Sequence, residues 1–227
     1  MEFERQIAIG DIHGCYGLTV DLVENVIKFD PERDQLIFIG DYIDRGTESA
    51  MVVRYVEELK NKYSVQIVLL AGNHEYLAYN AFKYRTAEMF QLWIINGGVT
   101  TIDSYEGVDN ANRYENSQKH LMPFVEQLEF YYETKTHIFM HGGIPLGETI
   151  ETAKKSSLLW ERSYDKYRGK DIIVGHTPHK HVTKYTNAVV IDTGAVFYGK
   201  LSAYDPINNK IYETINSNPR PRPGQKA

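Results

Sequence analysis

The sequence has very little cysteine: Cys15 is the only one in 227 residues, so no disulfide can form within the chain. A lone cysteine fits a reducing compartment, and we expect the protein to be cytoplasmic. The sequence also lacks any run of about 18 apolar residues, which argues against a membrane span. Its first residues lack the apolar core of a signal peptide.

The sequence also lacks an excess of positive charge, with 25 lysine and arginine residues against 30 aspartate and glutamate residues. The net charge of -5 argues against a nucleic-acid partner or an anionic membrane partner, either of which would require a basic face. A hydrophobic content of 42% with 24% charged residues is ordinary for a soluble globular protein. The sequence does not predict how many copies assemble.

The length predicts one domain, which we assign to residues 1–217. Residues 76–127 combine an aromatic-rich helical pattern with a polar stretch, and we expect them to form a helical and looped cover over the functional site. Residues 218–227 are rich in proline and arginine, and this composition predicts a disordered tail.

Three short apolar runs in the first third of the chain have the composition of buried strands: residues 6–9, 36–39 and 65–70. Helical patterns separate them, and Thr47 is the expected cap of the second helix. Strand, helix, strand, helix, strand predicts a parallel arrangement of α/β type.

Each of these runs ends in a glycine followed by polar residues. The motifs are G-D-I-H-G from Gly10, G-D-Y-I-D-R-G from Gly40, and G-N-H-E from Gly72. Because the carboxyl ends of parallel strands lie at one edge of a sheet, we expect these motifs to converge.

The second half of the chain contains further strand candidates that end in glycine-containing polar motifs. Residues 130–134 and 137–140 are adjacent strand candidates, and the second of them ends in H-G-G at His141. Residues 171–174 lead to G-H-T, which contains His176. Residues 189–191 lead to D-T-G, and residues 201–204 and 210–214 form an expected hairpin.

Six of the residues at strand ends have metal-binding side chains: Asp11, His13, Asp41, Asn73, His141 and His176. A mixed set of oxygen and nitrogen ligands suits manganese, iron, zinc or cobalt better than magnesium or calcium. Six ligands are too many for one tetrahedral ion but suit two ions roughly 3.5–4 Å apart. Such a pair generates hydroxide near neutral pH and clamps the attacking and leaving oxygens of a phosphoryl transfer. Asp41, at the middle strand end, is the candidate bridge.

Three further residues of these motifs have expected roles beside the metals. Arg45 could hold phosphate oxygens in a planar fork. His74 directly follows the ligand Asn73 and could donate a proton to the leaving group. Asp44 could accept a hydrogen bond from the imidazole of His74 and so hold its tautomer.

These motifs, with L-L-W-E-R at residues 158–162 and I-D-T-G-A-V-F at residues 191–197, occur in an order that resembles a known family. The sequence is similar to the phosphoprotein phosphatase branch of the calcineurin-like metallophosphoesterases, and within it to the bacterial and lambda-phage serine/threonine protein phosphatases. The resemblance covers roughly residues 6–205. It implies a four-layer α/β (α+β) fold, in which a central β-sandwich is flanked by helices.

The resemblance also implies roles for individual residues. It assigns Asp11 and His13 to the first metal, Asn73, His141 and His176 to the second, and Asp41 to both. It makes His74 the acid and Asp44 its partner, and it makes Arg45 and Arg162 the phosphate clamps, with Asn73 also facing the substrate. We expect two divalent ions, with Mn²⁺ preferred and iron, zinc or cobalt as alternatives.

The expected function is hydrolysis of phosphoserine and phosphothreonine in phosphorylated proteins or peptides, by in-line attack of a metal-bridging hydroxide. Phosphotyrosine and phosphohistidine stay open as substrates. The alternative is a hydrolase of dinucleoside polyphosphates or of another small phosphoester. His13 weakens that alternative, because the symmetrical dinucleoside tetraphosphatases have glutamine at this position. A non-catalytic scaffold is disfavoured because no catalytic position is missing.

The remaining histidines, His120, His137, His179 and His181, lack a glycine-flanked position after a strand and are interpreted as structural. Asp192 does follow a strand, and we interpret it as a turn residue or as a neighbour of the ligands.

Overall fold

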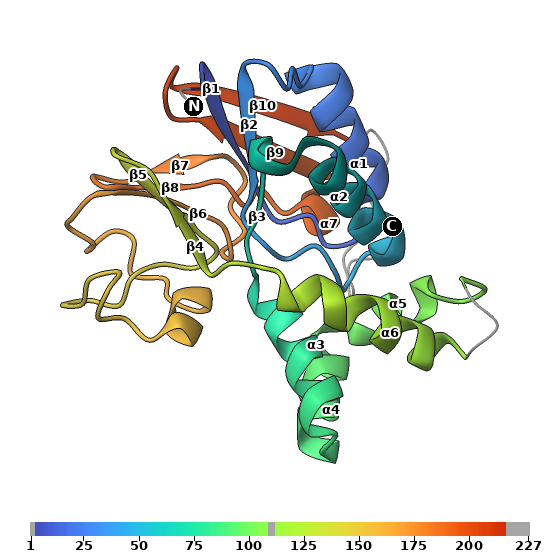
Figure 1. The fold of residues 1–227 in the computed structure, drawn as a ribbon. Coiled ribbons are helices and arrows are strands. Elements are labelled where there is room, and N and C mark those ends of the chain that lie inside the picture. The colour runs from blue at the N-terminus through green and yellow to red at the C-terminus, as the bar shows by residue number, and fades with distance from the viewer. Residues whose placement is uncertain (1–2, 109–111, 217–227) are drawn as a thin grey trace.

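The computed structural model describes residues 3–108 and 112–216. These residues form two five-stranded sheets that face each other, as Figure 1 shows. The proposed tail at residues 218–227 lies outside the described residues. None of the described helices has the length and apolar character needed to cross a membrane.

The first sheet has the strand order β10-β9-β1-β2-β3. Its strands are β1 (Arg5–Ile9), β2 (Asp34–Phe38), β3 (Ile67–Leu69), β9 (Lys200–Asp205) and β10 (Lys210–Ile215). Strands β1, β2 and β3 are parallel, with Ile7 opposite Leu36 and Leu36 opposite Ile67. The expected parallel arrangement and the β9–β10 hairpin are both confirmed.

The second sheet has the order β4-β5-β6-β8-β7. Its strands are β4 (Tyr131–Glu133), β5 (His137–Met140), β6 (Asp171–Val174), β7 (Thr183–Lys184) and β8 (Ala188–Val190). Strands β5, β6 and β8 are parallel to one another. The two-residue strand β7 was not expected, because so short a run has no detectable alternation.

Alternating side chains of each central strand serve two different cores, because successive residues of a strand point to opposite faces. Ala8 and Ile37 of the first sheet pack against Phe139 and Ile173 of the second, in a core between the sheets. Their neighbour Ile7 points to the other face, into the core shared with the helices. Sheet packed on sheet, with helices outside, confirms the expected sandwich.

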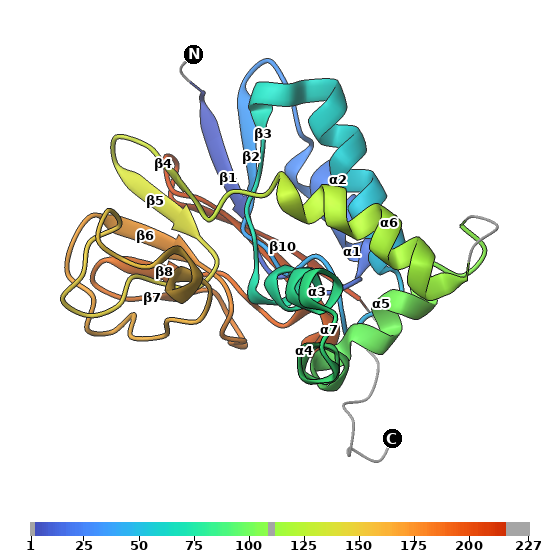
Figure 2. The same ribbon diagram turned by 60° about the horizontal axis from the view of Figure 1, so that its bottom comes forward.

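The helices on the outer face of the first sheet are α1 (Tyr16–Val20), which continues as a π-helical segment (Asp21–Ile27), and α2 (Ser49–Tyr63). Figure 2 shows them on the side away from the second sheet. Thr47 was wrongly expected to cap α2. The helix begins at Ser49 with Glu48 at its N-cap, and no side chain caps it.

The segment after β3 forms α3 (Asn73–Tyr84), α4 (Ala87–Trp93), a π-helical turn (Ile94–Gly98), α5 (Val99–Ser104) and α6 (Arg113–Glu126). Helix α6 begins at Arg113, where the Asn112 side chain accepts the backbone N–H of Glu115 and caps it. A short helix, α7 (Ala195–Tyr198), follows the D-T-G motif. A 3₁₀ turn (Lys155–Leu159) lies in the loop that covers the outer face of the second sheet.

Two glycines allow the loops after β2 and β3 to touch. Gly40 has φ +104°, and a Cβ there would lie 2.5 Å from the backbone nitrogen of Gly72. A Cβ on Gly72 would in turn lie 2.1 Å from Oδ1 of Asp41. The contact between these two strand ends therefore leaves no room for a side chain on either loop.

We expect Gly40→Ala to lower the free energy of unfolding by at least about 1–3 kcal/mol, because it adds both a backbone clash and an unfavourable φ. For a chain of this length that corresponds to a fall in Tm of several degrees, about 2–4 °C per kcal/mol. Gly17→Ala is the control, since its Cβ meets nothing within 4 Å and its helical backbone tolerates alanine. Equal Tm values for the two variants by calorimetry would contradict this account of Gly40.

Candidate metal centre

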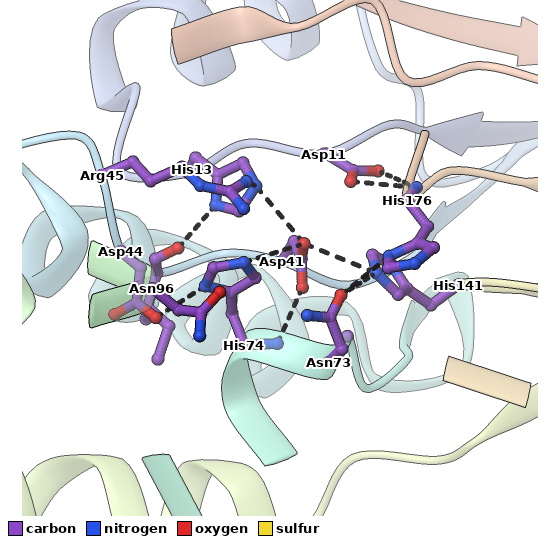
Figure 3. A network of polar contacts seen from close by, with 12 residues as sticks. Asp11, His13, Asp41, Asp44, Arg45, Asn73, His74, Asn96, His141 and His176 are labelled. Carbon is purple, nitrogen blue, oxygen red and sulfur yellow. Dashed lines mark hydrogen bonds and ion pairs between the residues drawn. The ribbon is translucent and has the colours of Figure 1, made fainter. Parts of the chain in front are cut away.

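The six residues expected to bind metal lie together at the carboxyl ends of the parallel strands of both sheets. Figure 3 shows them around Asp41, although the chain separates the first from the last by 165 residues. All six are buried. The set comprises Asp11 after β1, His13 in the same loop, Asp41 after β2, Asn73 at the start of α3, His141 after β5 and His176 after β6.

One half of this centre is formed by Asn73 and two histidines. Oδ1 of Asn73 lies 2.9 Å from Nε2 of His141 and 2.9 Å from Nδ1 of His176. Oδ2 of Asp41 lies 3.4 Å from the same Nε2 of His141. These atoms therefore face a common point from the start of α3 and from the loops after β2, β5 and β6.

Asp41 also faces the other half. Its Oδ2 lies 3.3 Å from Nε2 of His13. The ligand atoms of His13, Asp41 and His74 all lie within 4.8 Å of one another, and so do those of Asp11, Asp41 and His141. Asp41 is the member common to both groups, as a bridging ligand would be. The groups differ from the two ligand sets that the resemblance implies, because one contains His74 and the other joins Asp11 to His141.

The hydrogen bonds of the histidines fit metal binding. Nδ1 of His13 lies 2.8 Å from the carbonyl oxygen of Ile43, and Nδ1 of His141 lies 3.1 Å from that of Ile39. Since a carbonyl can only accept, each Nδ1 donates and each Nε2 keeps its lone pair. Nε2 of His141 faces Asp41, and Nε2 of His13 faces both Asp41 and the guanidinium of Arg45. Metal-binding histidines usually donate their second nitrogen in this way.

The electrostatics also fit cations. Burial lowers the pKa of His13 and of His141, and it lowers the pKa of His176 to about 3, so these imidazoles are neutral, which is the ligand form. Burial and the charges of Asp192 and Asp41 raise the pKa of Asp11. A divalent ion would relieve the repulsion between these carboxylates.

Asp192, predicted to be a turn residue or a neighbour of the ligands, is buried next to Asp11. Its Oδ1 accepts the backbone N–H of Gly194 at 2.9 Å, as a turn residue would. Burial raises the pKa of Asp192 to about 7.

His74 and Asp44 form a buried pair beside Asp41. Nδ1 of His74 lies 2.7 Å from Oδ2 of Asp44, and its Nε2 lies 3.9 Å from Oδ2 of Asp41. Burial lowers the pKa of His74, but the charges of Asp41 and Asp44 outweigh it, so the net shift is upward. The imidazole is thus stabilised in its protonated form, with Nε2 on the side of the metal ligands.

The two arginines occupy different positions. The Arg45 guanidinium contacts Nε2 of His13 and lies 5.3 Å from the ring centroid of Phe197, a residue the sequence had not connected with it. Arg162 is exposed on the loop after the 3₁₀ turn. Its charge adds to burial in lowering the pKa of His176, which places it near that half of the centre.

Glu75 has a supporting role that was not recognised from the sequence, although it completes the G-N-H-E motif. Its buried carboxylate accepts four backbone N–H groups: those of Gly72, Asp41, Tyr42 and Ile43, at 2.8–3.2 Å. It therefore fixes the loop that carries Asp41.

The loops that carry the site residues also contain strained backbone. Nine described residues other than glycine have a positive φ, and five of them lie in these loops: His13, Asp41, Asp44, Arg45 and His176, with φ between 46° and 70°. Each such residue costs about 1–3 kcal/mol and persists where the surroundings impose it, commonly at functional sites.

Comparison with known proteins agrees with this geometry. The family model for calcineurin-like phosphoesterases matches residues 5–207, and the chain belongs to this family. The chain is therefore a phosphoesterase of a metal-dependent class, with residues able to bind such metals.

Curated relatives carry two kinds of name. Serine/threonine-protein phosphatase 1 of Salmonella typhimurium is 31% identical, over 86% of this chain and 88% of its own length. An asymmetrical bis(5'-nucleosyl)-tetraphosphatase, PrpE of Anoxybacillus flavithermus, is also 31% identical, over 86% of this chain and 87% of its own length.

Solved structures share the fold. A putative diadenosine tetraphosphatase has a TM-score of 0.70 at 19% identity and covers 95% of both chains. A Saccharomyces cerevisiae protein serine/threonine phosphatase with similarity to human phosphatase PP5 has a TM-score of 0.67 at 16% identity. The match covers 96% of this chain and 81% of the yeast chain.

We expect Asp41→Asn to loosen binding of both ions, because the substitution removes the one carboxylate that both ligand groups share. Metal content after equilibration with MnCl₂ and dialysis should fall from about two ions per chain to below one. Asp171→Asn, at the opposite end of β6 from His176, is the control and should keep both ions. Two tightly held ions in Asp41→Asn would show that Asp41 is not the bridge.

Proposed function

We propose that the chain is a dinuclear metal-dependent phosphatase that hydrolyses phosphoserine and phosphothreonine in proteins, with Mn²⁺ as the preferred ion. The observation that carries the proposal is the buried His74–Asp44 pair, whose imidazole is aimed at the metal ligands. Seryl and threonyl oxygens are poor leaving groups, so an enzyme that cleaves these esters benefits from a positioned acid. The single cysteine supports a cytoplasmic location.

In this proposal the residues of the centre either bind the metal ions or bind the phosphate. Asp11, His13, Asp41, Asn73, His141 and His176 hold the ions. When bound, the ions supply a hydroxide at neutral pH and stabilise charge on the phosphoryl oxygens. Arg45 and Arg162, together with the amide of Asn73, bind and orient the phosphate.

In this proposal His74 supplies the proton that the leaving group takes up. Its Nδ1 donates to Asp44, so the proton for the leaving oxygen comes from Nε2. As the bond between phosphorus and the ester oxygen breaks, that proton neutralises the departing alkoxide. Asp44 stabilises the imidazolium before transfer and keeps the ring in one orientation.

We expect His74→Asn to lower kcat on a phosphoserine peptide by about 10²–10⁴-fold, the usual contribution of a general acid. Metal content should stay unchanged, since in this proposal His74 is not one of the six ligands. His137→Asn, at the start of the strand that ends at Met140, is the control and should keep wild-type turnover. An unaltered kcat in His74→Asn would remove this residue from the role of acid.

A second candidate function is hydrolysis of dinucleoside polyphosphates. It is favoured by Trp160, which is 43% exposed and whose ring lies 5.8 Å from that of His176, where it could stack on a nucleobase. The names of relatives such as the PrpE tetraphosphatase support the same candidate.

We expect the Mn-loaded protein to show at least a tenfold higher kcat/KM on phosphopeptides than on diadenosine tetraphosphate, which is about 1.4 kcal/mol of differential transition-state binding. Trp160→Leu should change this ratio by less than twofold. If the nucleotide is preferred and Trp160→Leu abolishes the preference, the second candidate function replaces the first.

A further inference from the structure

Two residues of the segment from 76 to 127 donate hydrogen bonds to the carboxylate that holds His74. Nε1 of Trp93 lies 3.1 Å from both oxygens of Asp44, and Oγ1 of Thr101 lies 2.6 Å from Oδ1. Asp44, Trp93 and Thr101 are all fully buried. With the imidazole of His74 at 2.7 Å, the carboxylate accepts from three side chains.

The hydroxyl of Thr101 also fixes the backbone of Asp44. It accepts the Asp44 backbone N–H at 2.8 Å, and the hydroxyl of Ser49 lies 3.2 Å from the same nitrogen. This contact helps to maintain the positive φ of 70° at Asp44. Thr101 thus holds both the backbone and the side chain of Asp44 in place. Asp44 in turn orients His74, and Figure 3 shows His74 between Asp44 and Asp41.

The N-G-G sequence at residues 96–98 explains how Trp93 and Thr101 reach Asp44. The indole of Trp93 packs against Gly98, where a Cβ would lie 2.7 Å from the ring. Gly97 has φ +111°, and its carbonyl accepts the backbone N–H of Arg45 at 3.4 Å. The chain kinks there, and α5 begins in the direction that brings Thr101 to Asp44.

The chemistry of these donors suits support of an acid. A buried carboxylate without partners is costly, and neutral donors stabilise its charge without adding a competing cation. The indole N–H can only donate, so it cannot take the proton of His74. The remaining geometric freedom of Asp44, rotation of its carboxylate, is removed by donors on both oxygens.

We propose that Trp93 and Thr101 are positioning residues for the proton transfer, which hold Asp44 so that His74 presents Nε2 to the leaving oxygen. This inference rests on the proposed function. It also gives the segment from 76 to 127 a specific role in the reaction, because that segment supplies the hydrogen-bond donors behind the acid and is not merely a cover.

A purely structural role is the alternative to be tested. Trp93 packs against Phe82 with ring centroids 5.0 Å apart, so deleting the whole side chain would perturb the core. Trp93→Phe keeps an aromatic ring in this place but removes the N–H together with the pyrrole part of the indole, and Thr101→Val exchanges the hydroxyl for a methyl group. Both should fold, and Tm measured for each variant reports any structural loss.

The test compares two leaving groups on Mn-loaded protein. Phenyl phosphate has a poor leaving group and needs the acid. The leaving group of 2,4-dinitrophenyl phosphate, 2,4-dinitrophenolate, departs without a proton. We expect each variant to lower kcat on phenyl phosphate on the order of tenfold, the size of one lost hydrogen bond to a charged group. The kcat on 2,4-dinitrophenyl phosphate, the KM and the metal content should change less than twofold.

A double-variant comparison separates positioning from packing. When Trp93→Phe or Thr101→Val is introduced into His74→Asn, no further loss of kcat on phenyl phosphate should appear, because the acid is already absent. The controls are Tyr167→Phe and Thr19→Val, which remove hydroxyls that donate to the backbone carbonyls of Lys170 and Cys15 and make no hydrogen bond to Asp44. They should leave the ratio between the two substrates unchanged.

The outcomes are distinguishable. If wild-type protein hydrolyses the esters but both variants slow them equally, or slow His74→Asn further, Trp93 and Thr101 only support the fold and the inference is wrong. If wild-type, metal-loaded protein hydrolyses neither ester, the proposed function itself is wrong, and the inference fails with it.

Discussion

The site depends on one carboxylate. Oδ2 of Asp41 lies within 3.3–3.9 Å of Nε2 atoms of His13, His141 and His74, and the backbone of Asp41 has a positive φ of 54°. Three features maintain this strained position: the close contact of Gly40 with Gly72, the backbone N–H bonds from this loop to Glu75, and the parallel pairing of β2 with its neighbours. The ligands of both halves are arranged around a residue that the sheet fixes in place.

Most of the centre was predictable because its positions follow from local patterns. A short apolar run that ends in glycine predicts both a strand and the residues at its carboxyl end, and parallel strands bring those ends together. This reasoning predicts that Asp11, Asp41 and Asn73, which follow three parallel strands of the first sheet, lie at one site. The helix that begins at Arg113 and the strand β7 were less predictable, since one depends on an N-cap and the other has two residues.

The residues that support the site were not predictable, for a physical reason. Trp93 and Thr101 lie in helices whose pattern gives only an apolar face, and their bonds to Asp44 span 49 and 57 residues. Such contacts depend on where a kink at Gly97 directs the chain, and no periodicity encodes that direction. The tryptophan was visible as a buried aromatic residue, but its N–H partner could be found only in three dimensions.

The choice of substrate, too, does not follow from the metal ligands. The named protein phosphatase and the named tetraphosphatase are both 31% identical to this chain over similar lengths, so overall identity does not distinguish their chemistries. In the proposed reaction the buried metal centre acts on a phosphoryl group, which both kinds of substrate share. What differs between the substrates is the group attached to it, and that group can be sensed only by residues that solvent also reaches. In this chain Trp160 and Arg162 have that exposure beside His176, so a preference for the nucleotide, the second candidate substrate, would depend on the loop at residues 158–162 rather than on the metal centre.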